Sequence, residues 1–460
     1  MNAVPDMKLT RAAAAFAAGL TYDRVPAVAV PRIAAAFADC VGVMLAGSAL
    51  PVTRIAMEFA GGRLPDGGFL GALRLPPAQA GLVYGTAAHA LDFDDTGLNG
   101  HPSAVLVPAI LAVAEHVPAD GRHMAAAYLA GFEVWGELAA RERDPHHEKG
   151  WHPSPVFGVV AATAAVANLR RLDAATTAAA LGIAASSAAG ICANFGTMMK
   201  PFQLGRAIQF AIEAVDLAAA GLTASDTALE ADLGFLRAFS PAGAVDTARP
   251  ARFGEHWEFL ESGINIKLYP MCYATHRLID ATLELMATHR LAAADVLSFE
   301  AELGPTQAAI LQHHDPKTVL NAKFSAEFAV AAAALRGKLG NAELTDATLA
   351  DPELRRLIRA TTVRVTTARD PEYPVFSPAD HVVAVLRDGR RLASQPVRRP
   401  RGHHTRFPGR AELWAKFADC AVPALDEDGA RALFDRLMAL QDIASVQQLY
   451  GAARHKEKTP

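Results

Sequence analysis

Residues 154–169 read SPVFGVVAATAAVANL, and alanine and valine fill more than half of these positions. The apolar residues recur at helical spacing, which predicts a helix. Alanine has the highest helix propensity of all residues, and small side chains allow neighbouring helices to approach closely. This stretch therefore predicts a closely packed helix, and it sets the pattern for the first half of the chain.

The same alanine-rich pattern continues on both sides of this stretch, while strand signals are almost absent from about residue 8 to residue 262. Further helices are predicted at residues 31–46, 78–96, 103–116, 125–141 and 206–222. The first half of the chain is therefore predicted to be all-α.

The pattern changes near Gly263. Strands are predicted at 296–303, 361–367, 381–386 and 392–397, the last two joined by a tight turn at Asp388-Gly389, and helices at 273–289 and 326–335. After a loop rich in proline, glycine and arginine at 398–410, helices return at 411–420 and 427–440. We predict a mainly α protein with an all-helical domain (1–263 with 409–460) and a smaller α+β lid domain (264–408).

Composition narrows the class of protein. Of the 460 residues, 51% are hydrophobic and 20% are charged, and the net charge is −4. That composition is typical of a globular protein, and the charge balance argues against nucleic-acid binding. The cysteines are far apart, without a CxxC pair, which predicts a reduced, cytoplasmic protein without a zinc or iron–sulfur framework: Cys40, Cys192, Cys272 and Cys420.

Two apolar segments resemble targeting or membrane segments. Residues 12–20 follow Lys8 and Arg11, but small residues are missing where a signal peptide would be cleaved, so an amphipathic first helix is predicted. Residues 178–199 are long enough to cross a bilayer, but contain several polar residues and much alanine and glycine. We predict a tightly packed buried helix with an irregular end there and no membrane span.

At four positions in the chain, a polar residue directly precedes a proline at the start of a helical stretch. Because proline is favoured in the first helical turn, the preceding residue should lie at or near the helix cap. Helix amino termini attract carboxylates and phosphates, and imidazoles there can also move protons. The alternative is that these prolines only begin helices. The four polar residues are His101, His152, Lys200 and Tyr269.

A second cluster is HALDFDDT at residues 89–96. On a helix His89, Asp92 and Thr96 would share a face, whereas Asp94 and Asp95 would point elsewhere. Such an acidic cluster with histidines is also a candidate metal site. No second acidic motif accompanies it, so we expect no metal.

A third cluster, KLYPMCYATHR at residues 267–277, lies at the predicted domain junction, where ligand clefts are common. His276 begins a helical pattern there, with capping as the alternative role, and Cys272 is expected to be a small buried residue. His146 and His147 precede Gly150-Trp151-His152 and are expected near the same site entrance.

Taken together in this order, several segments resemble the MmgE/PrpD family. They are HALDFDDT, HPS (101–103), GWHP (150–153), TMMKPFQLG (197–205), GLTASDTALEADLGF (221–235), residues 267–280 and AKFS (322–325). The family includes 2-methylcitrate dehydratase, cis-aconitate decarboxylase and iminodisuccinate epimerase. The resemblance covers nearly the whole chain and implies a homodimer in which each chain has a helical domain and a smaller α+β lid.

The resemblance also implies pocket positions. We assign Lys200 and His276 to carboxylate binding, and His101 and His152 to the general base and general acid in either order. Asp92 would orient an imidazole and Thr96 would donate a hydrogen bond. Further substrate-binding candidates are Lys267, Gln203 and His89.

The sequence departs from the family at three positions. Gln203 replaces a histidine, Phe328 replaces a pocket tyrosine, and His147 replaces another tyrosine. The primary prediction is a cofactor-free hydro-lyase acting on a small di- or tricarboxylate through a carbanion next to a carboxylate. The alternatives are an epimerase, a decarboxylase or an inactive carboxylate-binding relative. Activity is expected to need Lys200 and no metal, and Lys200→Ala is expected to leave the melting temperature nearly unchanged.

Overall fold

The computed structural model describes residues 7–63, 69–71, 73–142, 144–371 and 376–452, and the chain divides into two compact units. The helical unit comprises Met1–Ile264 with Arg410–Pro460, and the sheet unit comprises Asn265–Gly409. The sequence places both boundaries one residue earlier, at 263/264 and 408/409.

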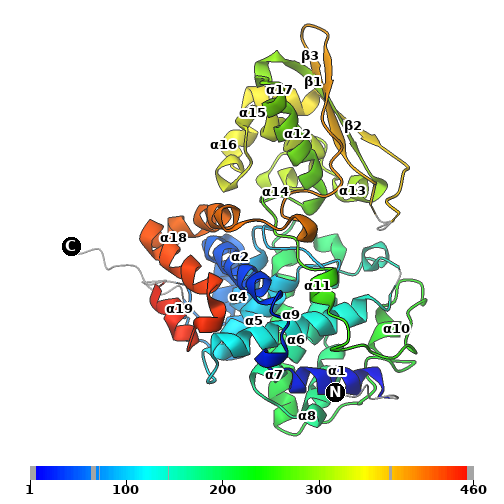
Figure 1. Ribbon diagram of the computed structural model, residues 1–460, viewed down its shortest axis with the longest axis vertical. Coiled ribbons are helices and arrows are strands. Elements are labelled where there is room, and N and C mark those ends of the chain that lie inside the picture. The colour runs from blue at the N-terminus through cyan, green and yellow to red at the C-terminus, as the bar shows by residue number, and fades with distance from the viewer. Residues whose placement is uncertain (1–6, 64–68, 72, 143, 372–375, 453–460) are drawn as a thin grey trace, which may run out of the picture. The chain divides into compact units, whose positions relative to one another are not determined.

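The helical unit contains only helices as regular elements among its described residues, so the mainly α fold class is confirmed (Figure 1). Its longer helices carry the apolar, alanine-rich stretches identified in the sequence. The elements are α1 Leu9–Gly19, α2 Val30–Ser48, α3 Pro51–Phe59, α4 Pro77–His89, α5 Pro102–Ala114, α6 Gly121–Ala139, α7 Pro153–Leu169, α8 Ala174–Ala185, α9 Met199–Ala219, α10 Phe235–Phe239, α11 Glu258–Glu261, α18 Arg410–Met438 and α19 Val446–Ala452.

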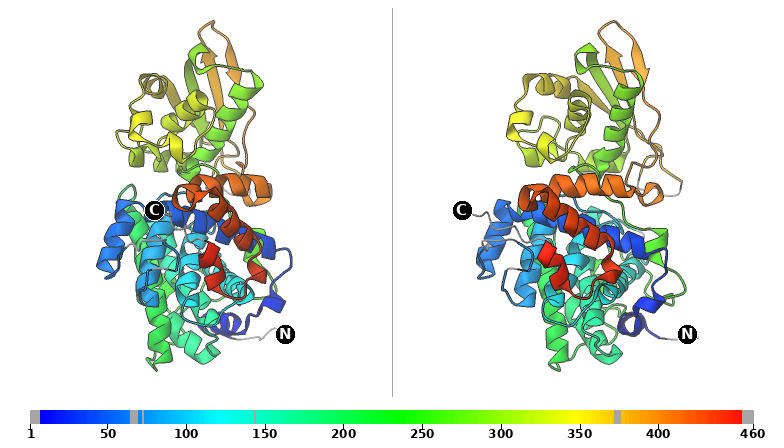
Figure 2. Two further views of the ribbon diagram at one scale, coloured as in Figure 1. Left: turned by 90° about the vertical axis from the view of Figure 1, so that its left-hand side faces the viewer. Right: turned by 60° about the vertical axis from the view of Figure 1, so that its left-hand side comes forward.

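Helices α5 and α7 form the centre of this unit, because neither has a polar face and every residue of both is buried. Helix α2 is long and apolar enough to cross a membrane by length and composition. It is 78% buried over that window and packs against α4 and α18, as a core helix does (Figure 2).

Two glycines bring α4 and α9 together. A Cβ atom at Gly205 would lie 2.3 Å from the carbonyl oxygen of Leu82, and one at Gly85 would lie 3.1 Å from the Cα of Gly205. Only glycine allows this approach without a shift of the backbone. The contact lies one turn from His89, the last residue of α4, and little more than a turn from Lys200 on α9.

The stretch at 178–199 has the irregular end that the sequence predicts, because α8 ends at Ala185 and Gly190 and Gly196 beyond it adopt positive φ. Two other predictions of helix extent are wrong. The helix predicted at 78–96 ends at His89, because Asp92 adopts a left-handed φ of 52°. No helix begins at Pro270, and the next α-helix starts at His276.

The sheet unit packs helices on a four-stranded sheet with the order β2-β1-β3-β4. Strands β1 and β2 are parallel, and β3 is antiparallel to both β1 and β4. The elements are α12 His276–Thr288, β1 Val296–Leu303, α13 Pro305–Ile310, α14 Val319–Ala322, α15 Ala326–Arg336, α16 Asp346–Leu349, α17 Pro352–Arg359, β2 Thr361–Val365, β3 His381–Leu386 and β4 Arg391–Ala393. The predicted turn at Asp388-Gly389 is confirmed, with Gly389 at a φ of 87°.

Candidate active site

The loop between α4 and α5 carries most of the candidate residues. Gly97 and Gly100 pair through two backbone hydrogen bonds of 2.8 and 3.0 Å, and Leu98 and Asn99 between them have φ of 50° and 60°. Positive φ at both central residues is the signature of a type I′ turn, which reverses the chain tightly. The chain then enters α5 with His101 as its N-cap, as the His-Pro pair predicts.

Two further helices supply the other side chains. His152 is the N-cap of α7, again as predicted from its His-Pro pair. Lys200 is the second residue of α9 and not its cap, because the helix begins at Met199 and is preceded by Met198 as N-cap. Gln203 lies one turn further along α9 and is buried.

Asp94 is the centre of this cluster, which corrects the prediction that it points elsewhere. Its Oδ1 lies 2.9 Å from Nδ1 of His89, and its Oδ2 lies 2.9 Å from Nδ1 of His101. Nδ1 of His101 also lies 3.0 Å from the carbonyl oxygen of Asp95. Carboxylate and carbonyl oxygens accept hydrogen bonds, so both imidazoles carry a proton on Nδ1.

Asp92 faces two cationic or cationisable side chains. Its Oδ1 accepts a hydrogen bond of 2.8 Å from Nζ of Lys200, and it lies 3.8 Å from Nε2 of His101. Nζ of Lys200 also lies 5.2 Å from the centre of the Phe195 ring, within the range of a cation–π contact. The structure thus brings Asp92, His101 and Lys200 together, although they come from three separate segments.

His152 has a defined tautomer because Gln203 has a defined orientation. The Gln203 amide nitrogen donates to the carbonyl oxygen of Ile191 over 3.2 Å, so its Oε1 faces Nδ1 of His152 at 2.8 Å. An amide oxygen only accepts, and Nδ1 of His152 therefore carries the proton. Nε2 of His152 is buried and has no hydrogen-bond partner among the described residues. In the neutral ring this nitrogen is the acceptor and the possible base.

Burial keeps two of these histidines neutral. It lowers the pKa of His89 to about 4, against the opposing effect of Asp94. Burial and the nearby charge of Lys200 lower the pKa of His152 well below its usual value. For Asp94, burial alone would raise the pKa, but His89 and His101 hold it well below its usual value. At neutral pH the cluster therefore contains an ionised Asp94 and neutral rings at positions 89 and 152.

Asp95 connects the α4–α5 loop to the first turn of α5. It accepts a hydrogen bond of 3.2 Å from the backbone N–H of Ser103 and contacts the Ser103 hydroxyl, which lies 2.8 Å from the hydroxyl of Tyr128. Burial and the neighbouring Asp39 raise the pKa of Asp95 to about 8. Asp95 therefore joins α5 to the loop as a largely protonated acid.

One group of described residues has the donor spacing of a metal site, with ligand atoms within 4.8 Å of one another: His89, Asp92, Asp94 and His101. The Lys200 ammonium already lies 2.8 Å from Asp92, and the Nδ1 protons of His89 and His101 are directed at Asp94 and at the carbonyl oxygen of Asp95, respectively. A divalent cation would have to compete with the ammonium for Asp92.

Three further predicted site residues are Thr96, Lys267 and His276. Thr96 is half-buried on the α4–α5 loop, so it does not share a helical face with His89 and Asp92 as predicted. Lys267 and His276 belong to the sheet unit, where both are buried. His276 is the first residue of α12 and its Nε2 lies 3.3 Å from the carbonyl oxygen of Met271.

Two of the departures from the family pattern also have a place in the structure. His147 is exposed, and the centre of its ring lies 6.2 Å from that of Phe195. Phe328 belongs to the hydrophobic core of the sheet unit and is fully buried. Phe195, which the sequence did not single out, packs against His152 with ring centres 4.8 Å apart.

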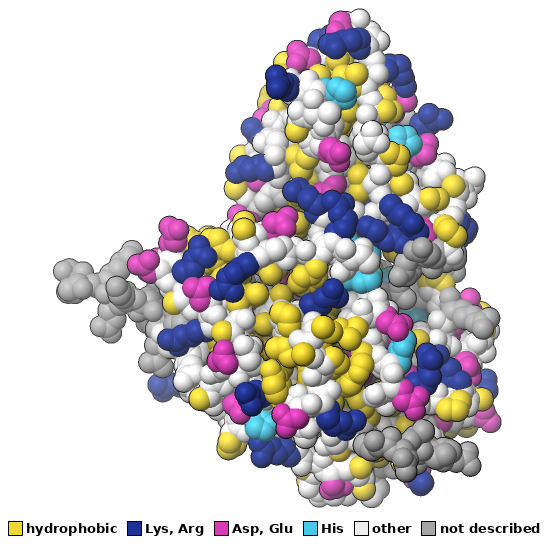
Figure 3. All heavy atoms as spheres, in the orientation of Figure 1, with side chains coloured by type: hydrophobic (Ala, Val, Ile, Leu, Met, Phe, Trp, Pro, Cys, Tyr) yellow, Lys and Arg dark blue, Asp and Glu magenta, His cyan; other side chains and the backbone are white. Residues whose placement is uncertain are grey.

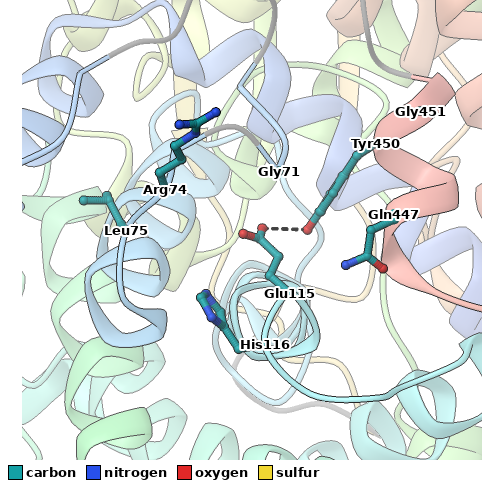
Figure 4. Close-up of a pocket in the computed structure, with 8 residues that line it drawn as sticks. All are labelled: Gly71, Arg74, Leu75, Glu115, His116, Gln447, Tyr450 and Gly451. Atoms are coloured by element: carbon teal, nitrogen blue, oxygen red, sulfur yellow. Dashed lines mark hydrogen bonds between the residues drawn. The ribbon is translucent and has the colours of Figure 1, made fainter.

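A separate hollow of about 370 Å³ lies elsewhere in the helical unit, and none of the predicted site residues lines it (Figure 4). Glu115 is at its centre, and its Oε1 accepts hydrogen bonds of 2.7 Å from the hydroxyls of Tyr84 and Tyr450. These bonds tie α4, α5 and α19 together, which indicates a structural role.

Comparison with known proteins places the chain among related sequences. Residues 11–248 match the MmgE/PrpD N-terminal domain and residues 269–440 match the MmgE/PrpD C-terminal domain. The second match continues beyond the sheet unit into α18.

The relatives with curated functions are cis-aconitate decarboxylases. The one from Homo sapiens is 26% identical over 381 residues, which cover 81% of this chain and 78% of the relative. The one from Mus musculus is 32% identical over 214 residues, covering 45% of this chain and 43% of the relative. The one from Aspergillus terreus is 27% identical over 231 residues, covering 47% of each.

Proposed function

Because this chain belongs to the MmgE/PrpD family, we propose that it is a lyase that removes carbon dioxide from a small unsaturated tricarboxylate of the cis-aconitate type. The sequence favoured dehydration and kept decarboxylation as an alternative. The names of the relatives support that alternative, and the cluster around Asp94 is compatible with its chemistry.

The observation that carries the proposal is the position of His101 between two carboxylates and beside an ammonium. Asp94 lies 2.9 Å from its Nδ1, Asp92 lies 3.8 Å from its Nε2, and Lys200 binds the same Asp92 oxygen. A protonated His101 would carry its positive charge close to both carboxylates. This arrangement can hold a proton next to a site for an anionic substrate and release it to carbon.

The reaction needs one proton and no redox partner. The bond between a methylene carbon and its carboxylate breaks, carbon dioxide leaves, and the electron pair moves through the adjacent C=C bond towards the carbon next to another carboxylate. That carbon then takes a proton, so that the trianion and one proton yield a dianion and carbon dioxide. We assign the proton to Nε2 of His101.

The other residues bind and orient the substrate. The Lys200 ammonium would leave or share Asp92 to bind a substrate carboxylate, and so stabilise the negative charge that develops next to it. The neutral His152 would accept a hydrogen bond on Nε2, which suits a protonated carboxyl or hydroxyl group of the ligand. Phe195 supplies an apolar wall beside both groups, where a departing carboxylate loses its solvation.

Product analysis tests this proposal. Purified protein is incubated separately with cis-aconitate, citrate, methylcitrate and iminodisuccinate, and released carbon dioxide, ultraviolet absorbance and products by NMR are recorded. We expect stoichiometric carbon dioxide, uptake of one proton and a five-carbon methylidene dicarboxylate from cis-aconitate alone.

Formation of an alkene from citrate or methylcitrate without carbon dioxide would instead establish the dehydratase. Inversion of iminodisuccinate would establish the epimerase. Thermal stabilisation by these acids without turnover would indicate the inactive carboxylate-binding relative. We expect full activity after treatment with a chelator, and loss of activity that a divalent ion restores would contradict the metal-free assignment.

A further inference from the structure

Lys416 on α18 is a buried lysine beside the α4–α5 loop that the proposed reaction does not use. Its Nζ donates a hydrogen bond of 2.7 Å to the carbonyl oxygen of Phe93 and lies 2.5 Å from Oδ1 of Asp39 on α2. The ammonium also lies 4.2 Å from the centre of the Phe93 ring. Both charged side chains are nearly inaccessible to solvent, at 4% and 1% exposure.

The residue that Lys416 holds lies between two site carboxylates in the sequence. Phe93 separates Asp92 from Asp94, and its ring packs in a small apolar cluster with Val43 and Cys420. Asp92 has a φ of 52°, a conformation that costs a residue with a side chain on the order of 1–3 kcal/mol unless its surroundings hold it. A rotation of the peptide that follows Phe93 would move Asp94 away from both imidazoles.

The loop is therefore held by two lysines of different function. Lys200 binds the Asp92 side chain at the site, while Lys416 binds the loop backbone at Phe93 from α18. Helices α2 and α18 pack along each other, so Asp39 can compensate the charge of Lys416 without touching the loop (Figures 1 and 2).

We propose that Lys416 is a positioning residue of the site. By holding the Phe93 carbonyl it keeps Asp92 against Lys200 and keeps Asp94 between His89 and His101. Only its kinetic readout rests on the proposed function, because the arrangement of the imidazoles can be measured without a substrate.

Three variants separate positioning from simple structural support. Lys416→Met removes the ammonium and keeps the length of the side chain, Asp39→Asn removes only the partner's charge, and the double variant removes both charges. Lys416→Met removes the ammonium from the buried Asp39 carboxylate and should lower the melting temperature. The double variant should recover most of that loss, because it removes both buried charges of the pair.

Across the three variants, kcat should depend on whether the hydrogen bond to the Phe93 carbonyl is present and not on the melting temperature. We expect Lys416→Met and the double variant to lose kcat about 10- to 100-fold with little change in KM, since a displacement of about 1 Å is enough for such a loss. Asp39→Asn should keep wild-type kcat, because its amide oxygen can still accept from Lys416, even if its melting temperature falls. A double variant that regains both stability and kcat would overturn the proposal.

NMR of the histidine side chains provides the readout that does not depend on turnover. In the wild type the Nδ1–H proton of His89 is directed at Asp94, and that of His101 is directed at the Asp95 carbonyl oxygen with Asp94 2.9 Å from the same nitrogen. Both protons should resonate far downfield in the free protein. Both signals should shift or broaden in Lys416→Met and in the double variant, and stay in Asp39→Asn. Unchanged spectra in both Lys416 variants would overturn the positioning role. If the wild type turned over none of the tested acids, the proposed function would fail, but these spectra would still test the role of Lys416.

Discussion

At the scale of single residues, the site depends on which nitrogen of each histidine carries a proton. Asp94 accepts from Nδ1–H of His89, the Asp95 carbonyl oxygen accepts from Nδ1–H of His101, and Gln203 accepts from Nδ1–H of His152. Each ring therefore has Nε2 available for ligand or substrate. The replacement of a family histidine by Gln203 supplies a neutral acceptor for this purpose, so it is compatible with activity.

Gln203→Glu should shift the pH dependence of activity. A carboxylate at this position would favour the charged form of His152 and raise its pKa, which burial and Lys200 now hold well below the usual value. Because His152 acts as a neutral acceptor, the acidic limb of the kcat/KM profile should move to higher pH. Gln312→Glu, which adds the same charge at an exposed glutamine of the sheet unit, is the control. An unchanged acidic limb would contradict the assigned role of His152.

Lys200→Met should lower kcat/KM by about 10- to 100-fold. The variant removes a charge-assisted hydrogen bond to a substrate carboxylate, and such a bond contributes about 1.5–3 kcal/mol. The ion pair with Asp92 corrects the expectation that stability stays unchanged. Both side chains are at most 10% exposed, so the variant removes the ammonium from a buried carboxylate and should destabilise the protein by about 3 kcal/mol.

The double variant Lys200→Met/Asp92→Asn tests both effects of Lys200. It should recover the melting temperature but not the activity, as measured by thermal unfolding and initial rates. Full activity in either variant would remove Lys200 from the mechanism.

Asp95→Asn should change how stability depends on pH. The folded-state pKa of Asp95 is about 8, above the value of about 3.9 expected in the unfolded chain, so the folded state binds this proton more tightly. The contribution of Asp95 to stability is therefore complete below about pH 4 and is lost as pH rises towards 8, by up to about 1.4 kcal/mol per pH unit.

Asparagine imitates the protonated acid towards Ser103 and does not titrate. The free energies of unfolding of Asp95→Asn and of the wild type are measured with denaturant at pH 5 to 9. The value of the variant minus that of the wild type should increase as pH rises. A constant difference across this range would show that Asp95 is ionised throughout.

At the scale of elements, the close contact of α4 with α9 aligns the site, because one helix ends at His89 and the other begins next to Lys200. Gly205→Ala would place a Cβ atom 2.3 Å from the carbonyl oxygen of Leu82, so the helices must separate. Such overpacking costs about 1–3 kcal/mol, and the melting temperature should fall by several degrees together with kcat.

Gly19→Ala is the matched control for this helix contact. Gly19 ends α1, and a Cβ atom there would have its nearest neighbour 3.9 Å away. This variant should be neutral or slightly stabilising, because alanine favours the helix. If Gly205→Ala were as stable and active as Gly19→Ala, the α4–α9 contact would not align the site.

At the scale of the whole molecule, we expect a homodimer formed through the helical unit. Large apolar side chains are exposed on its surface, including Ile55 and Phe59 on α3 and Met199 on α9, and the Phe59 ring contacts that of Phe202. Apolar side chains also gather on the visible face of this unit (Figure 3). Exposed apolar side chains, where they gather on a surface, are typical of a protein–protein interface.

Light scattering at micromolar concentration tests the dimer and should give twice the 48.5 kDa of one chain. Phe59→Glu should shift the mass towards that of one chain, whereas Leu233→Glu, at a fully exposed leucine of the same unit, should leave it unchanged. A wild-type mass of one chain would contradict the prediction.

The sequence alone determined the fold class, the positions of most helices and strands, and the helix-cap positions of His101 and His152. Helical periodicity, alanine content and X-Pro pairs are local signals, so they can be recognised in the sequence without tertiary structure. Local patterns also singled out Asp92 and Lys200, the family resemblance assigned them to a common pocket, and the structure joins them by an ion pair.

Only the tertiary structure decided that α4 ends at His89, that Asp94 lies between two imidazoles, and that Lys416 holds the loop from a helix more than 300 residues away. The periodic pattern predicted a continuous helix through Asp92, because left-handed backbone conformations of aspartate leave no clear mark in a sequence. Such a conformation persists only where distant groups hold it, and here buried lysines from α9 and α18 provide those contacts.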